Sequence, residues 1–299
     1  MSDSVWLEKG VSFNPTYILR VQHSLSSHPL LQLPRLQMLA ESLAGTDHIK
    51  FVLPNRKEAS AFYTISEREA KRNVGEVFQR IEEKGSWVAI YFAEADPDYR
   101  KLIDEALNSL APTVEPTDPG MSGYSLFIFV ASPPTITPFH FDRENNFNLQ
   151  ILGRKHLRVW PMNDREAVPE EAIENYFTHN SLSGLRYHDD LESRAKHFDV
   201  GPGDGLYVPC TSAHFVATEE YWATPGNSVS ISIALTYFTR ATRIRANAYL
   251  CNEFLRKHFS VNPTPPGRSP FLDSVKYPVA RALIKSRQML RNASIPRGL

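Results

Sequence analysis

Residues 137–160 decide the fold, because extended runs and turns alternate there: Thr137-Pro-Phe-His140-Phe-Asp142, then Asn148-Leu-Gln-Ile-Leu152, Gly153-Arg-Lys155 and His156-Leu-Arg-Val-Trp160. Two apolar runs separated by a short turn that contains Gly153 predict a β-hairpin. Further strand-like runs lie on both sides, at 124–130, 206–209, 214–218 and 229–238. About seven short strands punctuated by Gly and Pro predict a mainly β domain, either a sandwich or a barrel.

Helical periodicity flanks this β segment. On the N-terminal side it predicts a helix over 30–43, a helix that a Ser66/Glu69 capping box opens and Gly85 ends, a strand over 87–92 and a helix over 98–110. On the C-terminal side, apolar residues from Ile244 to Leu255 share a helix face, and a Pro-rich link over 262–270 precedes a last helix over 279–291. We therefore predict an N-terminal helical and strand flank over 1–120, a β core over 121–239 and C-terminal helices over 240–299.

The composition of the 299 residues is that of a soluble globular protein, with 42% hydrophobic and 22% charged residues. The two cysteines, Cys210 and Cys251, exclude a disulfide framework and suit a reducing compartment. No apolar run approaches the roughly 20 residues that span a bilayer, and the first residues lack the pattern of a signal peptide. We expect a cytoplasmic protein.

A set of metal-ligating side chains stands out in the β segment. His140 and Asp142 are two residues apart on a predicted strand, so they face one centre, and His214 begins a later strand. Two histidines and one carboxylate form the facial triad of non-haem Fe(II) oxygenases, although zinc, nickel and manganese also accept these ligands. The other eight of the ten histidines fit surface or core positions. A His-x-Asp pair alone is frequent by chance, and the shared β context of all three residues is what favours a metal site.

Lys155 adds a cation close to these ligands in the sequence. At the start of its predicted strand, its ammonium could reach the distal carboxylate of a dicarboxylate that chelates the metal, and Thr137 could donate a hydroxyl hydrogen bond to the same carboxylate. A buried lysine needs such a partner, because an unpaired charge is costly inside a protein. The spacing alone favours this interpretation no more than that of a solvated turn residue.

These segments, together with Val159-Trp-Pro161 and Val200-Gly-Pro-Gly-Asp-Gly-Leu-Tyr-Val-Pro209, resemble the JmjC/cupin-like Fe(II)- and 2-oxoglutarate-dependent oxygenases over about 124–238. Within that family, the pattern is most similar to the asparaginyl hydroxylases that act on hypoxia-inducible factor. The resemblance implies a double-stranded β-helix (jelly-roll) core. It also implies Fe(II) bound by His140, Asp142 and His214, and 2-oxoglutarate held by Lys155 and Thr137.

The same resemblance implies further residues of the cosubstrate pocket. Asn146 matches an asparagine that lines this pocket, and Tyr91 is a looser match to a tyrosine that contacts the distal carboxylate. The family's asparagine on the last core strand has no clear counterpart, because Ser232 or Ala234 falls at that place. Trp222, in a loop near His214, is a candidate for contact with a substrate, whereas we assign Cys210 to packing.

The resemblance implies an oxidative reaction, in which 2-oxoglutarate and O2 are converted to succinate and CO2 while a protein or peptide side chain is hydroxylated. Hydroxylation of an N-methyl group would release formaldehyde, so an N-methyl demethylase is an alternative outcome of the same chemistry. A nucleoside hydroxylase that acts on RNA or tRNA is a second alternative. A non-catalytic cupin-like binding or regulatory protein is a third, which the intact triad and Lys155 disfavour.

Charge is unevenly distributed, although Lys+Arg and Asp+Glu both number 33 and the formal charge is zero. Residues 240–299 contain twelve Lys or Arg against Glu253 and Asp273, a net charge of +10, so residues 1–239 carry −10. The zero total argues against an electrostatic nucleic-acid binder, but a basic face favours phosphate-rich partners such as RNA. We prefer the alternative that these helices form a homodimer contact or pack against the acidic body.

Overall fold

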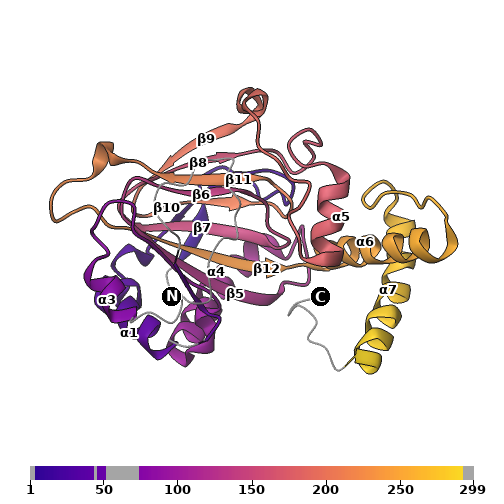
Figure 1. The fold of residues 1–299 in the computed structure, drawn as a ribbon, viewed down its shortest axis with the longest axis horizontal. Coiled ribbons are helices and arrows are strands. Elements are labelled where there is room, and N and C mark those ends of the chain that lie inside the picture. The colour runs from indigo at the N-terminus through magenta and orange to yellow at the C-terminus, as the bar shows by residue number, and fades with distance from the viewer. Residues whose placement is uncertain (1–3, 44–45, 52–73, 292–299) are drawn as a thin grey trace.

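The computed structural model describes residues 4–43, 46–51 and 74–291, and the predicted capping box at Ser66 and Glu69 lies outside these residues. Two antiparallel sheets make up the β core (Figure 1). The larger described sheet has the order β1 (Val5–Leu7), β2 (Leu19–His23), β10 (Asp204–Val208), β7 (Asn145–Leu152), β12 (Ser230–Phe238), β5 (Ser122–Ala131), β4 (Trp87–Ile90) and β3 (Ile49–Phe51). The smaller has the order β6 (Thr135–His140), β11 (His214–Thr218), β8 (Lys155–Val159) and β9 (Lys196–Val200). This confirms the predicted mainly β jelly roll with flanking helices.

Helices cover the outer face and one end of the core (Figure 1). The described α-helices are α1 (Leu33–Ser42), α3 (Val74–Gln79), α4 (Pro97–Val114), α5 (Glu170–His179), α6 (Arg240–Phe259) and α7 (Pro270–Arg291). Asp96 caps α4 by accepting hydrogen bonds from the backbone of Asp98 and Tyr99, and Thr239 forms a capping box with Thr242 at the start of α6. The last helix, α7, begins at Pro270, nine residues before the start predicted at Val279.

Alternating side chains on the central strands separate the core from the interior between the sheets. On β12, Ile231, Ile233 and Leu235 join one large apolar cluster that also contains Leu102, Ile103 and Leu110 of α4. Burial of each such side chain stabilises the fold by about 1.5–3 kcal/mol. The residues between them, Ser232 and Ala234, line a cavity instead. The strand is buried on both faces, but only one of the two is packed with apolar side chains.

The predicted hairpin over 148–160 is wrong. β7 pairs with β10 and β12 in the larger sheet, whereas β8 pairs with β11 and β9 in the smaller one. The intervening Gly153 has a φ of +67°, which suits glycine, and turns the chain from one sheet into the other. Both edges of β7 are already hydrogen-bonded, so β8 has no free edge of β7 on which to pair.

Several elements are absent from the sequence-based expectations. β1 and β2 extend the larger sheet at one edge, and β9 extends the smaller one. Helix α5 lies in the polar stretch after Trp160, and its buried residues Ile173 and Phe177 pack in a second apolar cluster with Trp160 and Tyr249. In the described part of the chain, no helix is both long enough and apolar enough to cross a membrane.

Candidate metal centre

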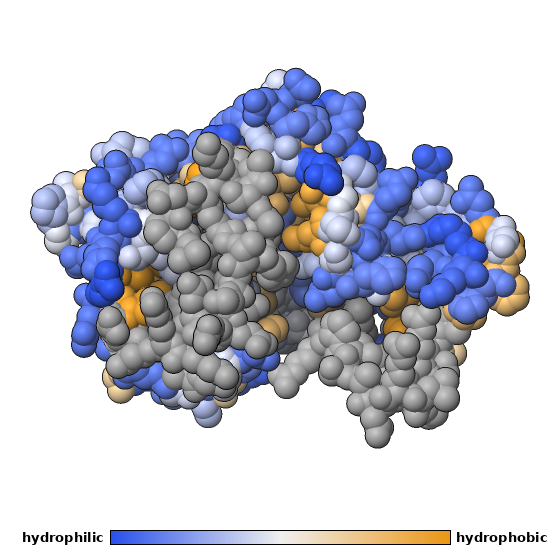
Figure 2. Space-filling view, viewed as in Figure 1, coloured by the Kyte–Doolittle hydropathy of each residue, from blue (hydrophilic) through white to orange (hydrophobic). Residues whose placement is uncertain are grey.

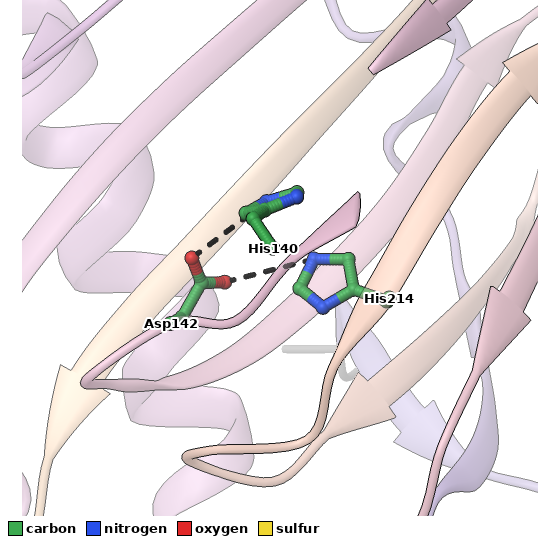
Figure 3. A group of neighbouring side chains, drawn as sticks. All are labelled: His140, Asp142 and His214. Carbon is green, nitrogen blue, oxygen red and sulfur yellow. Dashed lines mark ion pairs between the residues drawn. The ribbon is translucent and has the colours of Figure 1, made fainter. Parts of the chain in front are cut away.

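Two neighbouring strands of the smaller sheet place the histidines. His140, the last residue of β6, lies directly opposite His214, the first residue of β11, and their ring centroids are 4.3 Å apart. Side chains at opposed positions of an antiparallel pair are close neighbours on the same face of the sheet. Asp142 follows two residues beyond the end of β6, in the loop before β7, and its carboxylate points at both rings (Figure 3). The structure therefore brings the three predicted ligands together.

Backbone carbonyls orient both imidazoles. Nδ1 of His140 lies 2.7 Å from the carbonyl oxygen of Pro138, and Nδ1 of His214 lies 3.0 Å from that of Ser212. A carbonyl only accepts hydrogen bonds, so each Nδ1 carries a proton, and Nε2 is the nitrogen that either ring offers to a metal. The Nε2 atoms lie 4.0 Å and 3.9 Å from the two carboxylate oxygens of Asp142. Burial lowers the pKa of His140, which keeps this ring neutral and able to bind a metal.

The carboxylate is held in place as well. The amide of Asn146, on β7, donates a hydrogen bond of 3.0 Å to Oδ2 of Asp142. Across residues 4–43, 46–51 and 74–291, His140, Asp142 and His214 are the one group of three or more such side chains arranged to hold a metal ion. Two imidazole nitrogens and one carboxylate oxygen suit Fe(II) and other divalent first-row metals.

The three ligands line a cavity of about 600 Å³ between the two sheets. Lys155 also lines it and is only 5% exposed, and its Nζ donates a hydrogen bond of 2.6 Å to Oγ of Ser232. The same Nζ lies 5.7 Å from the centroid of the Phe129 ring. Burial lowers the pKa of Lys155 to about 7. Lys155 is thus a buried cavity residue and not a solvated turn residue, whereas its contact with a cosubstrate carboxylate stays a prediction.

The other predicted cosubstrate residues also line this cavity: Thr137 on β6, Asn146 on β7, and Tyr91 just after β4. The Tyr91 ring packs against Phe127, with 5.2 Å between the centroids. Ser232 and Ala234 on β12 both line it, and Ser232 is the residue of that strand that contacts Lys155. The structure therefore gathers these side chains around one space.

Trp222 is not brought to this cavity. It is not among the lining residues, and its ring lies against Gly153, where an added Cβ would be 2.7 Å from Cη2 of the indole. Cys210 is buried, its thiol donates to the carbonyl oxygen of Arg143 over 3.1 Å, and burial raises its pKa to about 12. A protonated, enclosed thiol is a packing residue, as expected.

Among the cavity residues that are absent from the sequence-based expectations, four come from two segments. Arg143 and Glu144 follow the ligand Asp142, and Tyr176 and Asn180 come from α5 and its C-terminal cap. A sequence signal for α5 exists, because Glu170 and Glu171 follow a proline and precede apolar residues with helical spacing. No local signal places that helix beside the metal ligands.

Comparisons with known proteins agree with this architecture. A family model described as a JmjC domain matches residues 121–242. JmjC domain-containing protein F of Dictyostelium discoideum is 28% identical over 137 residues, which cover 39% of this chain and 27% of that protein. Lysine-specific demethylase 8 of Danio rerio is 29% identical over 93 residues, which cover 29% and 22%. The chain thus spans about a quarter of the length of these relatives.

Among solved structures, ycfD of Escherichia coli matches 94% of this chain and 69% of that chain, with 13% identity and a TM-score of 0.47. YcfD in complex with cobalt and 2-oxoglutarate, described as a ribosomal oxygenase, matches 90% and 63%, with 14% identity and a TM-score of 0.46. The family match and the jelly-roll fold confirm the JmjC/cupin-like resemblance, whereas the closer likeness to asparaginyl hydroxylases stays a prediction. Residues 121–242 of this chain form a JmjC domain.

Proposed function

We propose that this protein is an Fe(II)- and 2-oxoglutarate-dependent oxygenase that oxidises a protein or peptide side chain. One observation carries the proposal: a His-Asp-His ligand set and a buried lysine ammonium share a single cavity. The ligand set would bind a divalent metal, and the ammonium would pair with a negatively charged group of a bound ligand. A metal chelator with a second, distal carboxylate is the ligand that matches both.

The surroundings of Lys155 strengthen the case for an anionic ligand. Among the described residues, no carboxylate pairs with its ammonium, which contacts the Ser232 hydroxyl and the Phe129 ring. A buried cation without a counter-charge is costly, and the fold tolerates it where a ligand supplies the negative charge. Thr137 and Ser232 offer hydroxyl groups to the same carboxylate.

The chain's own residues position the reactants. His140, Asp142 and His214 would hold Fe(II), which supplies the capacity to activate O2 and leaves coordination positions for the keto acid. Asn146 fixes the orientation of the Asp142 carboxylate. Phe127, Phe129 and Val216 line the cavity with apolar surface, which limits the access of water to the cosubstrate.

One relative, lysine-specific demethylase 8 of Danio rerio, is named for an action on lysine, which supports a protein substrate. Hydroxylation of an N-methyl group and hydroxylation of a carbon would use the same site, so demethylation remains an alternative product of this chemistry. Formaldehyde release distinguishes it from stable hydroxylation, which adds 16 Da to the peptide. We keep the cytoplasmic location inferred from the sequence as a prediction.

Anaerobic titration with Fe(II) and then 2-oxoglutarate tests the proposal, followed by aerobic measurement of succinate with candidate peptides. We expect binding of both, and succinate release that His140→Ala and His214→Ala abolish. Replacement of Arg100, an exposed residue of α4, by Ala is the matched surface control. Absence of 2-oxoglutarate binding in the wild-type protein, or succinate release that survives His140→Ala, would contradict the assignment.

RNA is a second candidate substrate, and the +10 charge of residues 240–299 favours it. Part of this charge is used within the fold, because Arg243 donates to the carbonyl oxygen of Gly120 and the hydroxyl of Ser122. Binding of a single-stranded RNA pool at increasing salt decides the question. Phosphate contacts predict an affinity that falls steeply with salt, whereas undetectable or salt-insensitive binding rules this candidate out.

We also propose a homodimer through the C-terminal helices. On α7, the apolar side chains of Phe271, Val275 and Val279 are 74%, 51% and 45% exposed and recur at spacings of four residues. Figure 2 shows apolar surface at the outer end of the α6–α7 pair, among mostly hydrophilic residues. Light scattering of the full chain should give the mass of a dimer, and Val275→Glu should convert it to a monomer.

A further inference from the structure

Arg143 brings a second cation into the cavity, beside the metal ligands rather than beside Lys155. It follows Asp142 in the loop between β6 and β7, and its guanidinium carbon lies 5.0 Å from the ring centroid of Tyr176 on α5. Both residues line the cavity. The loop and the helix together therefore hold a guanidinium against an aromatic face, an arrangement that fixes its orientation.

The guanidinium lacks acceptors. Its Nε and Nη1 atoms are buried and have no hydrogen-bond partner among the described residues. Burial raises the pKa of the adjacent Glu144, and the charge of Arg143 partly offsets that rise. A buried donor without an acceptor is unfavourable, and more so when it is charged. The remaining nitrogen, Nη2, is not among these enclosed atoms, and it shares with Nε the edge that binds a carboxylate through two parallel hydrogen bonds, as Arg194 binds Asp164. A carboxylate that reaches Nη2 from the cavity is thus the acceptor that this guanidinium lacks.

Strand register separates this position from Lys155. On β12, the Lys155 partner Ser232 pairs with Gln150, and Thr236 pairs with Asn146, the residue that holds Asp142. The four residues from Ser232 to Thr236 correspond to roughly 13 Å along the strand. Arg143 precedes Asn145, which pairs with Tyr237 still farther along β12, so it lies beyond the metal ligands as seen from Lys155. An anion at Arg143 is therefore a different group from the distal carboxylate of the cosubstrate.

The neighbouring charges select the kind of anion. Apart from the metal ligands, Lys155 and two tyrosines, the ionisable side chains that line the cavity with Arg143 are the acids Glu144 and Asp47, and Asn180 adds a neutral amide. These acids repel a chain of phosphates more strongly than a single carboxylate, whose one charge a single cation balances. Building on the proposed oxygenase function, we propose that Arg143 binds the carboxylate of an Asp or Glu side chain in the peptide substrate, close to the residue that is oxidised.

Fluorescence anisotropy with the full chain in its Mn(II) form tests this assignment. The probes are pools of labelled ten-residue peptides whose variable positions are uncharged and whose fixed central residue is Asp, Glu, Asn or Gln. Because Asn and Gln match the acids in size, the comparison isolates the charge. A single-stranded RNA pool of twelve nucleotides is the third probe. Each titration is done with and without N-oxalylglycine, an unreactive analogue of 2-oxoglutarate.

The wild-type protein should bind the acidic pools about 10- to 100-fold more tightly than the amide pools, the range expected for a charge-assisted hydrogen-bonded pair. Arg143→Gln should abolish this difference while leaving the melting temperature and N-oxalylglycine binding unchanged. Arg143→Lys should retain part of it, because a lysine keeps the charge but not the two-point contact. Arg100→Gln, a matched exposed arginine on α4, should keep all of it.

Equal binding of acidic and amide pools by the wild-type protein, or a difference that persists in Arg143→Gln, would overturn the assignment. Tighter, Arg143-dependent binding of the RNA pool would overturn the choice of a peptide. If the oxygenase proposal is wrong, the wild-type protein will not bind N-oxalylglycine, which is a different result from the two above. The titrations without the analogue still measure the preference of Arg143 for an acidic peptide.

Discussion

The pH dependence of 2-oxoglutarate binding should report directly on Lys155. Burial lowers the pKa of this ammonium from 10.5 to about 7 in the free protein. Each pH unit corresponds to about 1.4 kcal/mol, so holding the charge inside costs about 5 kcal/mol relative to water. A bound dicarboxylate returns part of that energy by pairing with the ammonium, and so it must raise the pKa of Lys155 in the complex.

The sign of the effect follows from this difference. Below pH 7, Lys155 is already charged in the free protein, and the affinity for 2-oxoglutarate should be constant. Above pH 7, binding must take up a proton, so the dissociation constant should rise up to tenfold per pH unit until the pKa of the complex is reached. In the free protein, burial of the Lys155 ammonium destabilises the fold in full below about pH 7. This penalty is lost as the pH rises from about 7 to 10.5, because the unfolded chain there holds a proton that the folded protein has released, so the free energy of unfolding should increase with pH.

Isothermal titration calorimetry of the Mn(II)-loaded protein from pH 6 to 9, in two buffers of different ionisation enthalpy, measures both the affinity and the proton uptake. The matched ligand is 2-oxobutyrate, which chelates a metal in the same way but lacks the distal carboxylate. The ratio of the two dissociation constants cancels the protonation of the metal ligands. We expect Lys155→Met to remove the preference for 2-oxoglutarate and Lys155→Arg to keep it without pH dependence. A ratio that Lys155→Met leaves unchanged, or that is flat in the wild-type protein, would refute the reasoning.

Three further predictions concern the supports of the site. Asn146→Ala should weaken Mn(II) binding about 10- to 100-fold, because the Asp142 carboxylate loses its hydrogen bond, whereas Asn148→Ala, also in the cavity wall, should have a smaller effect in the same titration. Gly205→Ala should lower the free energy of unfolding in urea by about 3 kcal/mol, since its Cβ would lie 2.7 Å from the backbone oxygen of Asn148. Trp160→Ala should lower the free energy of unfolding in urea by about 3–5 kcal/mol, because a fully buried ring and its hydrogen bond to the carbonyl oxygen of Leu191 are lost. A decrease below about 1 kcal/mol would contradict the packing of Trp160.

The metal ligands could be predicted from the sequence because each is tied to its neighbours by local rules. His140 lies next to Asp142 at the end of an extended run, and His214 begins another run after a Gly-Pro-Gly turn. Strand alternation and the chemistry of imidazole and carboxylate then suffice to group them. What the local pattern does not contain is the pairing of β6 with β11, which sets His140 opposite His214.

The hairpin error has the same origin. A two-residue connection is ordinarily the mark of antiparallel neighbours, but Gly153 and Arg154 join strands of different sheets. The pairing of β7 with β10 and β12 uses the backbone groups that a hairpin with β8 would need. Both of these partner strands are more than 50 residues away from β7 in the chain. The outcome of that competition depends on long-range contacts. Tyr176 and Asn180 went unnoticed for the same reason, since nothing near them in sequence indicates the metal.

One feature of the sequence does locate the cavity once the jelly roll is known. Apolar residues alternate with small or polar ones along 146–151, as Asn146-Phe-Asn-Leu-Gln-Ile151, and along 230–236, as Ser230-Ile-Ser-Ile-Ala-Leu-Thr236. In an ordinary half-exposed strand the polar positions face water. Here both strands are central in the larger sheet and buried on both faces, so their polar positions face the space between the sheets. Buried polar groups need partners, and two of these residues find one in the cavity: Asn146 binds Asp142, and Ser232 binds Lys155. The side-chain oxygens of Asn148 and Gln150 have no partner among the described residues. Polar alternation on a strand that cannot reach solvent is therefore evidence for a ligand cavity, and it places that cavity over the residues that hold the proposed cosubstrate.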